Sequence, residues 1–351
     1  MKALHKIIIL TFSLFILSCN KDEEEDKAEI PISNITFTDS PIDLLNIQAK
    51  FAKDIAYDNK ERTQLDIWLP NSNVPTGLVI YVHRGGFTSG DKDFVYTEQS
   101  GGAWNFPNDI RYFLQNNIAF ASIRYTLLKP TGETEGIKKP MADVRRALQY
   151  LRYRASDFNI NKNNVILAGN SAGAGTSLWI AFNNDFAELQ NADPILRESS
   201  RVKGVVARET QSSYNIEERW VKDVFQDYNL TWTEILNNET GNISKIYGVS
   251  SIAQYESPAI DAYRKDVDML SLMSADDPEI WINNTLRDVV NPYNPFNPDI
   301  PSHHAFHARA LKEKAVEVGL KNVTYYGKNP IIYADPSNES WTEFCKRKIN
   351  E

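Results

Sequence analysis

The chain has 351 residues, a hydrophobic fraction of 42% and a formal net charge of −8 at pH 7. This length can bury a large core, and it fits one α/β domain with an inserted segment better than two domains. The acidic balance argues against nucleic acid as a partner, because phosphate binding needs a basic surface. With two cysteines, one of which is assigned to lipidation below, a disulfide framework is excluded.

The N-terminal region is typical of a targeting segment. An apolar run over residues 7–17 is too short to span a bilayer. Ile16-Leu17-Ser18-Cys19 resembles a bacterial lipobox, which implies that Cys19 becomes the lipidated first residue after cleavage. The acidic run that follows resembles the export tag of surface lipoproteins of Bacteroidota, and it also fits a solvated tether. We expect a signal peptide at 1–18, an acidic tether at 19–46, and a lipid anchor as the only membrane contact. The expected location is a bacterial outer membrane, and the sequence leaves open whether the protein is displayed at the cell surface.

Residues 47–351 alternate strand and helix patterns, which predicts a doubly wound, mostly parallel α/β sheet. Periodicity weakens and aromatic residues accumulate between 211 and 262, so we expect a cap inserted above the sheet there. The expected strands are 50–57 and 62–69, forming a hairpin, then 78–82, 118–124, 165–168, 202–208, 268–272 and 322–326. The expected helices are 104–116, 141–154, 174–182, 305–318 and 340–349.

A glycine-rich pentapeptide, Gly169-Asn170-Ser171-Ala172-Gly173, lies between the strand expected at 165–168 and the helix expected at 174–182. G-x-S-x-G between a strand and a helix is typical of a nucleophile elbow. The chain turns so sharply there that glycine is needed beside the serine, whose hydroxyl is presented above the sheet. Ser171 is therefore the predicted nucleophile.

A second motif, His83-Arg84-Gly85-Gly86, follows the strand expected at 78–82. With the G-x-S-x-G elbow, it resembles the esterase/lipase branch of the α/β-hydrolase superfamily, whose H-G-G-G-type loop follows an early strand. The resemblance implies an oxyanion hole formed by the backbone N–H groups of Gly85, Gly86 and Ala172. Arg84 departs from the first glycine of that loop, which leaves these donors intact and places a cation at the rim.

The superfamily's strand–G-x-x-D pattern implies that the catalytic acid is Asp277, with Ser274 at the glycine position and the strand at 268–272. Open α/β sheets bind their ligands beyond the carboxyl ends of the strands, where such an acid belongs. Asp276 is the neighbouring alternative. Glu209, which ends the preceding strand, is a weaker candidate acid and is better explained as an anchor for the cap.

No histidine lies after the last expected strand, where the superfamily usually carries its general base. The remaining candidates are His303, His304 and His307, with Ser302 as the expected N-cap of their helix. Some bacterial esterase-like proteins that resemble this chain in its G-x-S-A-G-A-G-T-S-L and E-T-Q-S-S-Y stretches also carry a His-His pair here. Adjacent helical residues point about 100° apart, so only one of the pair can face the serine. We favour His304 over His303 as the base, and expect His307 to make packing or cap contacts.

Together these residues predict a serine ester hydrolase that forms an acyl-enzyme, with no cofactor. H-H-x-x-H alone is too weak a pattern to predict a metal site. The expected substrate is a small-molecule or oligosaccharide ester, with acyl groups on carbohydrate suggested by the lipoprotein signal. Two alternatives stay open: a catalytically weak, glycan-binding lipoprotein of the same fold, and a serine peptidase. The sequence leaves the oligomeric state open.

Overall fold

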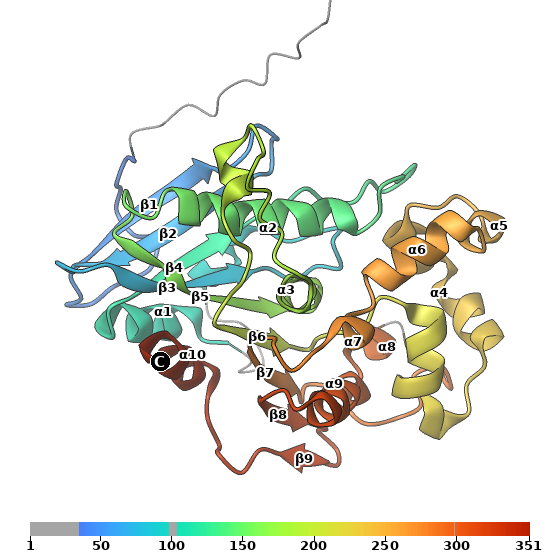
Figure 1. The fold of residues 1–351 in the computed structure, drawn as a ribbon. Coiled ribbons are helices and arrows are strands. Elements are labelled where there is room, and N and C mark those ends of the chain that lie inside the picture. The colour runs from blue at the N-terminus through green and yellow to red at the C-terminus, as the bar shows by residue number, and fades with distance from the viewer. Residues whose placement is uncertain (1–34, 98–103, 298) are drawn as a thin grey trace, which may run out of the picture.

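The computed structural model describes residues 35–97, 104–297 and 299–351. Its centre is a sheet of nine strands in the order β1-β2-β4-β3-β5-β6-β7-β8-β9 (Figure 1). The strands from β4 to β8 run parallel, while β1, β2 and β9 pair antiparallel with their neighbours. The predicted α/β fold is confirmed. The strands are β1 (Ala49–Ala56), β2 (Gln64–Pro70), β3 (Thr76–Val82), β4 (Ile118–Ile123), β5 (Ile160–Asn170), β6 (Gly204–Arg208), β7 (Glu279–Asn284), β8 (Asn322–Tyr326) and β9 (Tyr333–Ala334).

Helices cover both faces of the sheet, because successive side chains of a strand point to opposite faces. Along β3, Leu78, Ile80 and Val82 belong to one buried cluster with apolar residues of α2, α3 and α9. Val79 and Tyr81 belong to a second cluster with residues of α1 and α10. The strand β3 is therefore buried at every position, with side chains packed on both faces. The helices are α1 (Phe106–Gln115), α2 (Lys138–Tyr153), α3 (Ala172–Phe182), α9 (Ala305–Val318) and α10 (Trp341–Asn350).

The hairpin expected at the start of the domain is present as β1 and β2, but the strand expected at 268–272 is wrong. Those residues form a short helix, α7 (Met269–Leu272), and the strand follows later as β7. Short apolar runs fit a buried helix turn as well as a strand, so periodicity alone does not separate them. The error shifts the expected end of this strand by twelve residues, from 272 to 284, and with it the place where a catalytic acid should lie.

Between β6 and β7 the chain leaves the sheet and forms a group of helices beside α7 to α9 (Figure 1). Its aromatic side chains largely fill its own interior, since Trp220, Phe225, Tyr247 and Tyr255 are buried. Its helices are the π-helix η3 (Ile216–Val224), the 3-10 helix η4 (Gln226–Tyr228), α4 (Trp232–Tyr247), α5 (Ile252–Tyr255) and α6 (Pro258–Asp266). The remaining short elements are η1 (Lys92–Tyr96), η2 (Pro194–Arg197) and α8 (Asp299–His303).

The expected signal peptide, Cys19 and most of the expected tether lie outside the described residues. Within the described part of the chain, no helix is both long enough and apolar enough to cross a bilayer. Cys345, the second cysteine, is a buried residue of α10.

Candidate active site

Ser171 lies at the turn between β5 and α3, with φ 52° and ψ −119°. Positive φ is costly for a residue with a side chain, and strain of this kind is held in place by the surrounding structure. The flanking glycines explain how the turn is made. A Cβ atom on Gly169 would lie 2.3 Å from the backbone of Gly173, and one on Gly173 would lie 2.1 Å from the carbonyl oxygen of Val82. This is the geometry of a nucleophile elbow.

The loop after β3 brings backbone N–H groups to the same place. Gly85 has φ 121°, and a Cβ there would lie 2.1 Å from the carbonyl oxygen of Ser89. The Gly85 carbonyl accepts hydrogen bonds from the amides of Thr88 and Ser89, which closes the loop. Among the described residues, no acceptor takes the N–H groups of Gly85, Gly86 or Ala172. Free amides beside a serine hydroxyl are what an oxyanion hole requires.

His83 supports this loop from below and does not take part in the cavity. Its ring stacks on Tyr125 at 4.2 Å between centroids, and its Nδ1 lies 2.7 Å from the carbonyl oxygen of Arg84. Burial lowers the pKa of His83 to about 4, so the ring is neutral near pH 7. Arg84 itself is exposed and stacks its guanidinium over the ring of Phe94.

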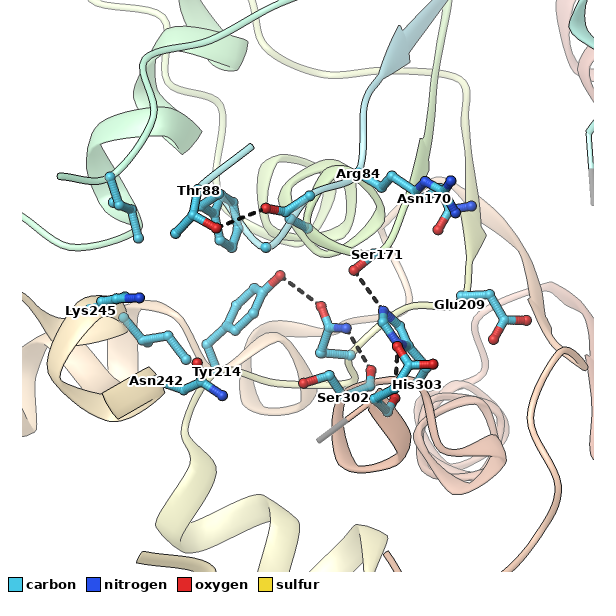
Figure 2. Close-up of a pocket in the computed structure, with 18 of the residues that line it drawn as sticks. Arg84, Thr88, Asn170, Ser171, Glu209, Tyr214, Asn242, Lys245, Ser302 and His303 are labelled. Carbon is cyan, nitrogen blue, oxygen red and sulfur yellow. Dashed lines mark hydrogen bonds and ion pairs between the residues drawn. The ribbon is translucent and has the colours of Figure 1, made fainter. Parts of the chain in front are cut away.

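His303 is the histidine that meets the serine. Its Nε2 lies 2.8 Å from Ser171 Oγ. Its Nδ1 lies 3.0 Å from the carbonyl oxygen and 3.2 Å from Oδ1 of Asp299, and both of these atoms are acceptors. Nδ1 therefore carries the ring proton, which leaves the Nε2 lone pair free to accept the serine proton. Ser171, His303 and Asp299 thus form a continuous hydrogen-bonded series, of which Figure 2 shows the contact between Ser171 and His303.

Asp299 begins α8, one helical turn before His303, and the sequence analysis did not identify it. Its second carboxylate oxygen lies 2.5 Å from a guanidinium nitrogen of Arg287. The hydrogen bond from His303 lowers the pKa of Asp299 to about 2, and the nearby charge of Arg287 adds to this effect. Asp299 and His303 have i, i+4 spacing, which is the signal that could have paired them.

A cavity of about 430 Å³ opens above Ser171 and His303. Figure 2 shows Thr88, Tyr214, Asn242 and Lys245 on one side of the serine, and Arg84, Asn170 and Glu209 on the other. Apolar side chains of Leu128, Ile246 and Leu286 also line it. Because α4 contributes Asn242, Lys245 and Ile246, the helices inserted between β6 and β7 form part of the wall of this cavity. Among the described residues, no group of side chains has the composition of a metal site.

The profile of the BD-FAE family, a family of α/β-hydrolase-type esterases, matches residues 65–257, which is more than half of the chain. The chain belongs to the BD-FAE family. The family assignment confirms the predicted resemblance and makes the protein a carboxylic ester hydrolase. No curated protein matches the sequence.

Solved structures show the same fold at low sequence identity. A truncated carbohydrate esterase from gut microbiota has 16% identity and a TM-score of 0.57, covering 86% of this chain and 96% of its own. An acetyl ester-xyloside bifunctional hydrolase from Caldicellulosiruptor lactoaceticus has 14% identity and a TM-score of 0.54, covering 93% of each chain. Esterase B from Lactobacillus rhamnosis has 14% identity and a TM-score of 0.53, covering 86% of each chain.

In this BD-FAE protein His304 points away from Ser171, although the sequence analysis favoured it as the base. Its Nδ1 accepts the amide of Phe306, so His304 and not Ser302 is the N-cap of α9. Its Nε2 lies 3.1 Å from the carbonyl oxygen of Val290 and 3.2 Å from the hydroxyl of Tyr228. His304 itself interrupts the helix, with an extended ψ of 140°, so the two histidines do not continue one helix as their spacing suggested. Burial lowers the pKa of His304 to about 4.

His307 makes the packing contacts expected of it. Its Nδ1 accepts the backbone N–H of Ser212, and its Nε2 lies 2.8 Å from the carbonyl oxygen of Pro301. The ring therefore joins the segment after β6 to α8. Burial lowers the pKa of His307 to about 3, so it stays neutral in the folded protein near pH 7.

Asp277 lies at the edge of the sheet opposite Ser171. It precedes β7, whereas Ser171 follows β5, and β5, β6 and β7 are parallel. Its carboxylate accepts the Ser274 backbone N–H at 2.7 Å and lies 3.5 Å from a guanidinium nitrogen of Arg201. Asp276 beside it is exposed, and its carbonyl oxygen accepts a hydrogen bond from Arg201. The structure does not bring either residue to the serine, because the strand expected to precede them lies after them.

Glu209 follows β6 and lines the cavity with Ser171 and His303. One of its carboxylate oxygens accepts the backbone N–H groups of Thr285 and Leu286 at 2.9 and 3.0 Å. The residue therefore anchors the loop after β7, where the sequence analysis expected an anchor for the cap.

Proposed function

We propose that this BD-FAE protein hydrolyses carboxylic esters through an acyl-enzyme formed on Ser171. The observation that carries the proposal is the 2.8 Å separation between Ser171 Oγ and His303 Nε2 in a cavity that also presents free backbone amides. His303 takes the hydroxyl proton as Ser171 Oγ forms a bond to the ester carbonyl carbon. Asp299 holds the ring in the tautomer that this transfer needs.

The negative charge that develops on the carbonyl oxygen needs hydrogen-bond donors at the moment of attack. The N–H groups of Gly85, Gly86 and Ala172 are the donors we assign to it. His303 then returns its proton to the leaving alkoxide, and the alcohol departs. A water molecule repeats the sequence on the acyl-enzyme, with His303 again taking the proton, and releases the carboxylic acid.

For the substrate, we propose an acyl ester of a carbohydrate. The carbohydrate esterase and the acetyl ester-xyloside hydrolase of similar fold support this choice. The cavity offers both apolar surface and the polar side chains of Asn242 and Lys245, which suits an acyl group attached to a hydroxylated alcohol. The glycan-binding alternative rested on the missing histidine, and the position of His303 argues against it.

The test of the mechanism is Ser171→Ala assayed on 4-nitrophenyl acetate and on acetylated xylo-oligosaccharides. Loss of the hydroxyl should abolish turnover while circular dichroism and Tm stay close to the parent, because only one oxygen is removed. A fluorophosphonate should label the parent at Ser171 and leave the variant unlabelled. Full activity in Ser171→Ala would falsify the proposed nucleophile. Activity on the aryl ester without activity on the acetylated oligosaccharides would remove the carbohydrate substrate.

We also propose that Cys19 carries a lipid that anchors the protein in a bacterial membrane. The lipobox-like sequence supports this, since acyl chains at this cysteine would supply the membrane affinity. Cys19→Ala should move the protein from the membrane fraction to the soluble fraction. A parent protein that is soluble and carries no lipid by mass spectrometry would contradict the proposal.

A further inference from the structure

Glu209 has an unusual position for a carboxylate that only ties two loops together. It follows β6 directly, with φ 47°, and is 3% exposed. Positive φ at a residue with a long side chain is a strained conformation, and such strain concentrates at functional sites. The amide of Glu209 donates to the carbonyl oxygen of Asn283 in β7, which holds the backbone in this conformation.

The two oxygens of the Glu209 carboxylate have different surroundings. Oε1 accepts two backbone N–H groups from the loop after β7. Oε2 is buried and has no hydrogen-bond partner among the described residues. A buried carboxylate oxygen without a partner is costly, so its retention calls for an explanation in terms of function.

Asp299, the carboxylate that contacts His303, is less well placed to stabilise a charge. Its side chain is 49% exposed, and its second oxygen is engaged by Arg287. Its own carbonyl oxygen also competes for Nδ1 of His303. When His303 takes the proton of Ser171, a positive charge forms on a ring whose paired carboxylate is screened by solvent and by a guanidinium.

We propose that Glu209 is a positioning residue that acts beside Asp299 as a second carboxylate near His303. Its charge stabilises the imidazolium of His303, and its hydrogen bonds keep Arg287 in place to pair with Asp299. This inference rests on the proposed function. Both residues line the same cavity, and the buried position of Glu209 leaves its charge less screened than that of Asp299. The hydrogen bonds to Thr285 and Leu286 fix the chain just before Arg287, which pairs with Asp299.

The electrostatics of the site agree with this placement. Burial raises the pKa of Glu209, and the charge of His303 is the largest influence that opposes the rise. The titratable and charged groups that influence His303 are Glu209 after β6, Arg287 after β7, Asp299 in α8 and His307 in α9. The cations Arg84 and Lys245 line the same cavity. Of the two carboxylates in this set, Glu209 is the one that is almost fully buried.

The test separates the charge of Glu209 from its hydrogen bonds. Glu209→Gln keeps an oxygen that can accept the amides of Thr285 and Leu286 but removes the charge. We expect kcat to fall by about tenfold with little change in KM, and the acidic limb of the kcat/KM profile to move to lower pH by about half a unit or more. The sign follows because a nearby negative charge favours the imidazolium. Glu209→Ala removes both roles and should lose more activity and also lower Tm.

Glu239→Gln is the matched control. Glu239 is a buried carboxylate of α4 whose pKa is also raised by burial, and it is hydrogen-bonded to Asn242 and Tyr293. Its variant should leave the acidic limb in place. An unchanged limb and wild-type kcat in Glu209→Gln would overturn the inference, provided that the parent needs Ser171 for hydrolysis. If the parent itself lacks activity, the proposed function fails and not this inference alone.

If Glu209→Gln does not fold, Glu209→Asp decides the question, because it keeps the charge and shortens the side chain. The acidic limb should then stay within about 0.2 units of the parent even where kcat falls. If the acidic limb of Glu209→Asp moves as far as that of Glu209→Ala, which lacks the charge, the role of Glu209 is purely structural.

Discussion

Ser171 and His303 lie 2.8 Å apart, yet the chain holds the two residues in different ways. Ser171 lies between a central strand and a helix, at a turn whose flanking glycines have no room for a side chain, because an added Cβ would lie 2.1 to 2.3 Å from backbone atoms. His303 ends a helix of five residues. That helix is held by side chains from elsewhere: Gln211 donates to the carbonyl oxygen of Ser302, and His307 bonds that of Pro301. Close backbone packing places Ser171, and side chains from distant segments place His303.

The largest effect that tests this comparison comes from the two adjacent histidines. His303→Ala should lower kcat about 10⁴-fold with Tm close to the parent, because it removes the base and few buried contacts. His304→Ala should keep kcat within about threefold in the folded protein. It should lower the free energy of unfolding by about 2 kcal/mol, because it removes the N-cap of α9. Steady-state kinetics and urea unfolding separate the two. Equal losses of kcat in the two variants would contradict the proposal that His303 alone is the base.

At the elbow the expected effect is on folding. Gly173→Ala should destabilise the protein by about 3 kcal/mol or more, because the new Cβ would lie 2.1 Å from the carbonyl oxygen of Val82. Gly241, within α4, is the control. A Cβ there meets nothing within 4 Å, so Gly241→Ala should stabilise the protein by about 0.5 to 1 kcal/mol. Chemical denaturation of both variants is the measurement, and a well-folded Gly173→Ala would refute the account of the elbow.

The two aspartates on either side of β7 give a smaller contrast in activity. Asp299→Asn should lower kcat by about 10²-fold, less than is usual for a triad aspartate, because the Asp299 carbonyl oxygen still accepts from Nδ1. Asp277→Asn should leave kcat unchanged and cost about 1 kcal/mol of stability, since it weakens contacts with Ser274 and Arg201. Kinetics on 4-nitrophenyl acetate decide the matter. A larger loss of kcat in Asp277→Asn than in Asp299→Asn would restore the acid predicted from sequence.

Low pH should destabilise the folded protein through His307. Its pKa is about 3 in the folded protein, below the value of about 6.5 in the unfolded chain. The unfolded chain therefore binds a proton that the folded protein does not, and stability falls as pH drops from 6.5 toward 3. Lowering the pH from 7 to 5 should reduce the free energy of unfolding by about 2 kcal/mol through this histidine alone. His304 and His83, with pKa values near 4, act in the same direction.

The three buried histidines each lower the free energy of unfolding as the pH falls. His307→Gln removes one of them, so it should reduce their combined loss between pH 7 and 5 by roughly one third. Urea unfolding at pH 7, 6 and 5 measures the slope. An identical slope in the parent and in His307→Gln would mean that His307 takes up its proton in the folded protein as readily as in the unfolded chain.

Most of the sheet could be predicted from the sequence, because its central strands contain continuous apolar runs bounded by turns. The two-residue β9 was not predicted, and β7 was misplaced. Its neighbour Met269–Leu272 carries the same apolar character in four residues, too few for the helical period to differ from a strand. That misplacement moved the expected acid to the opposite edge of the sheet. Asp299 was missed because it follows no strand directly, and it reaches His303 through one turn of a short helix.

By itself the sequence indicated the elbow and the glycine loop, because each motif spans only a few positions, and the α/β-hydrolase fold, because alternating strand and helix patterns are local. Gly169 has a local reason to be glycine, since a Cβ there would meet the backbone of Gly173, whereas the requirement at Gly173 comes from Val82 of the neighbouring strand β3. The choice of His303 over its neighbour, and the pairing with Asp299, were decided only by the tertiary structure. The break in the helix at His304 directs one ring to Ser171 and the other to Val290, and side chains distant in sequence hold this segment in place.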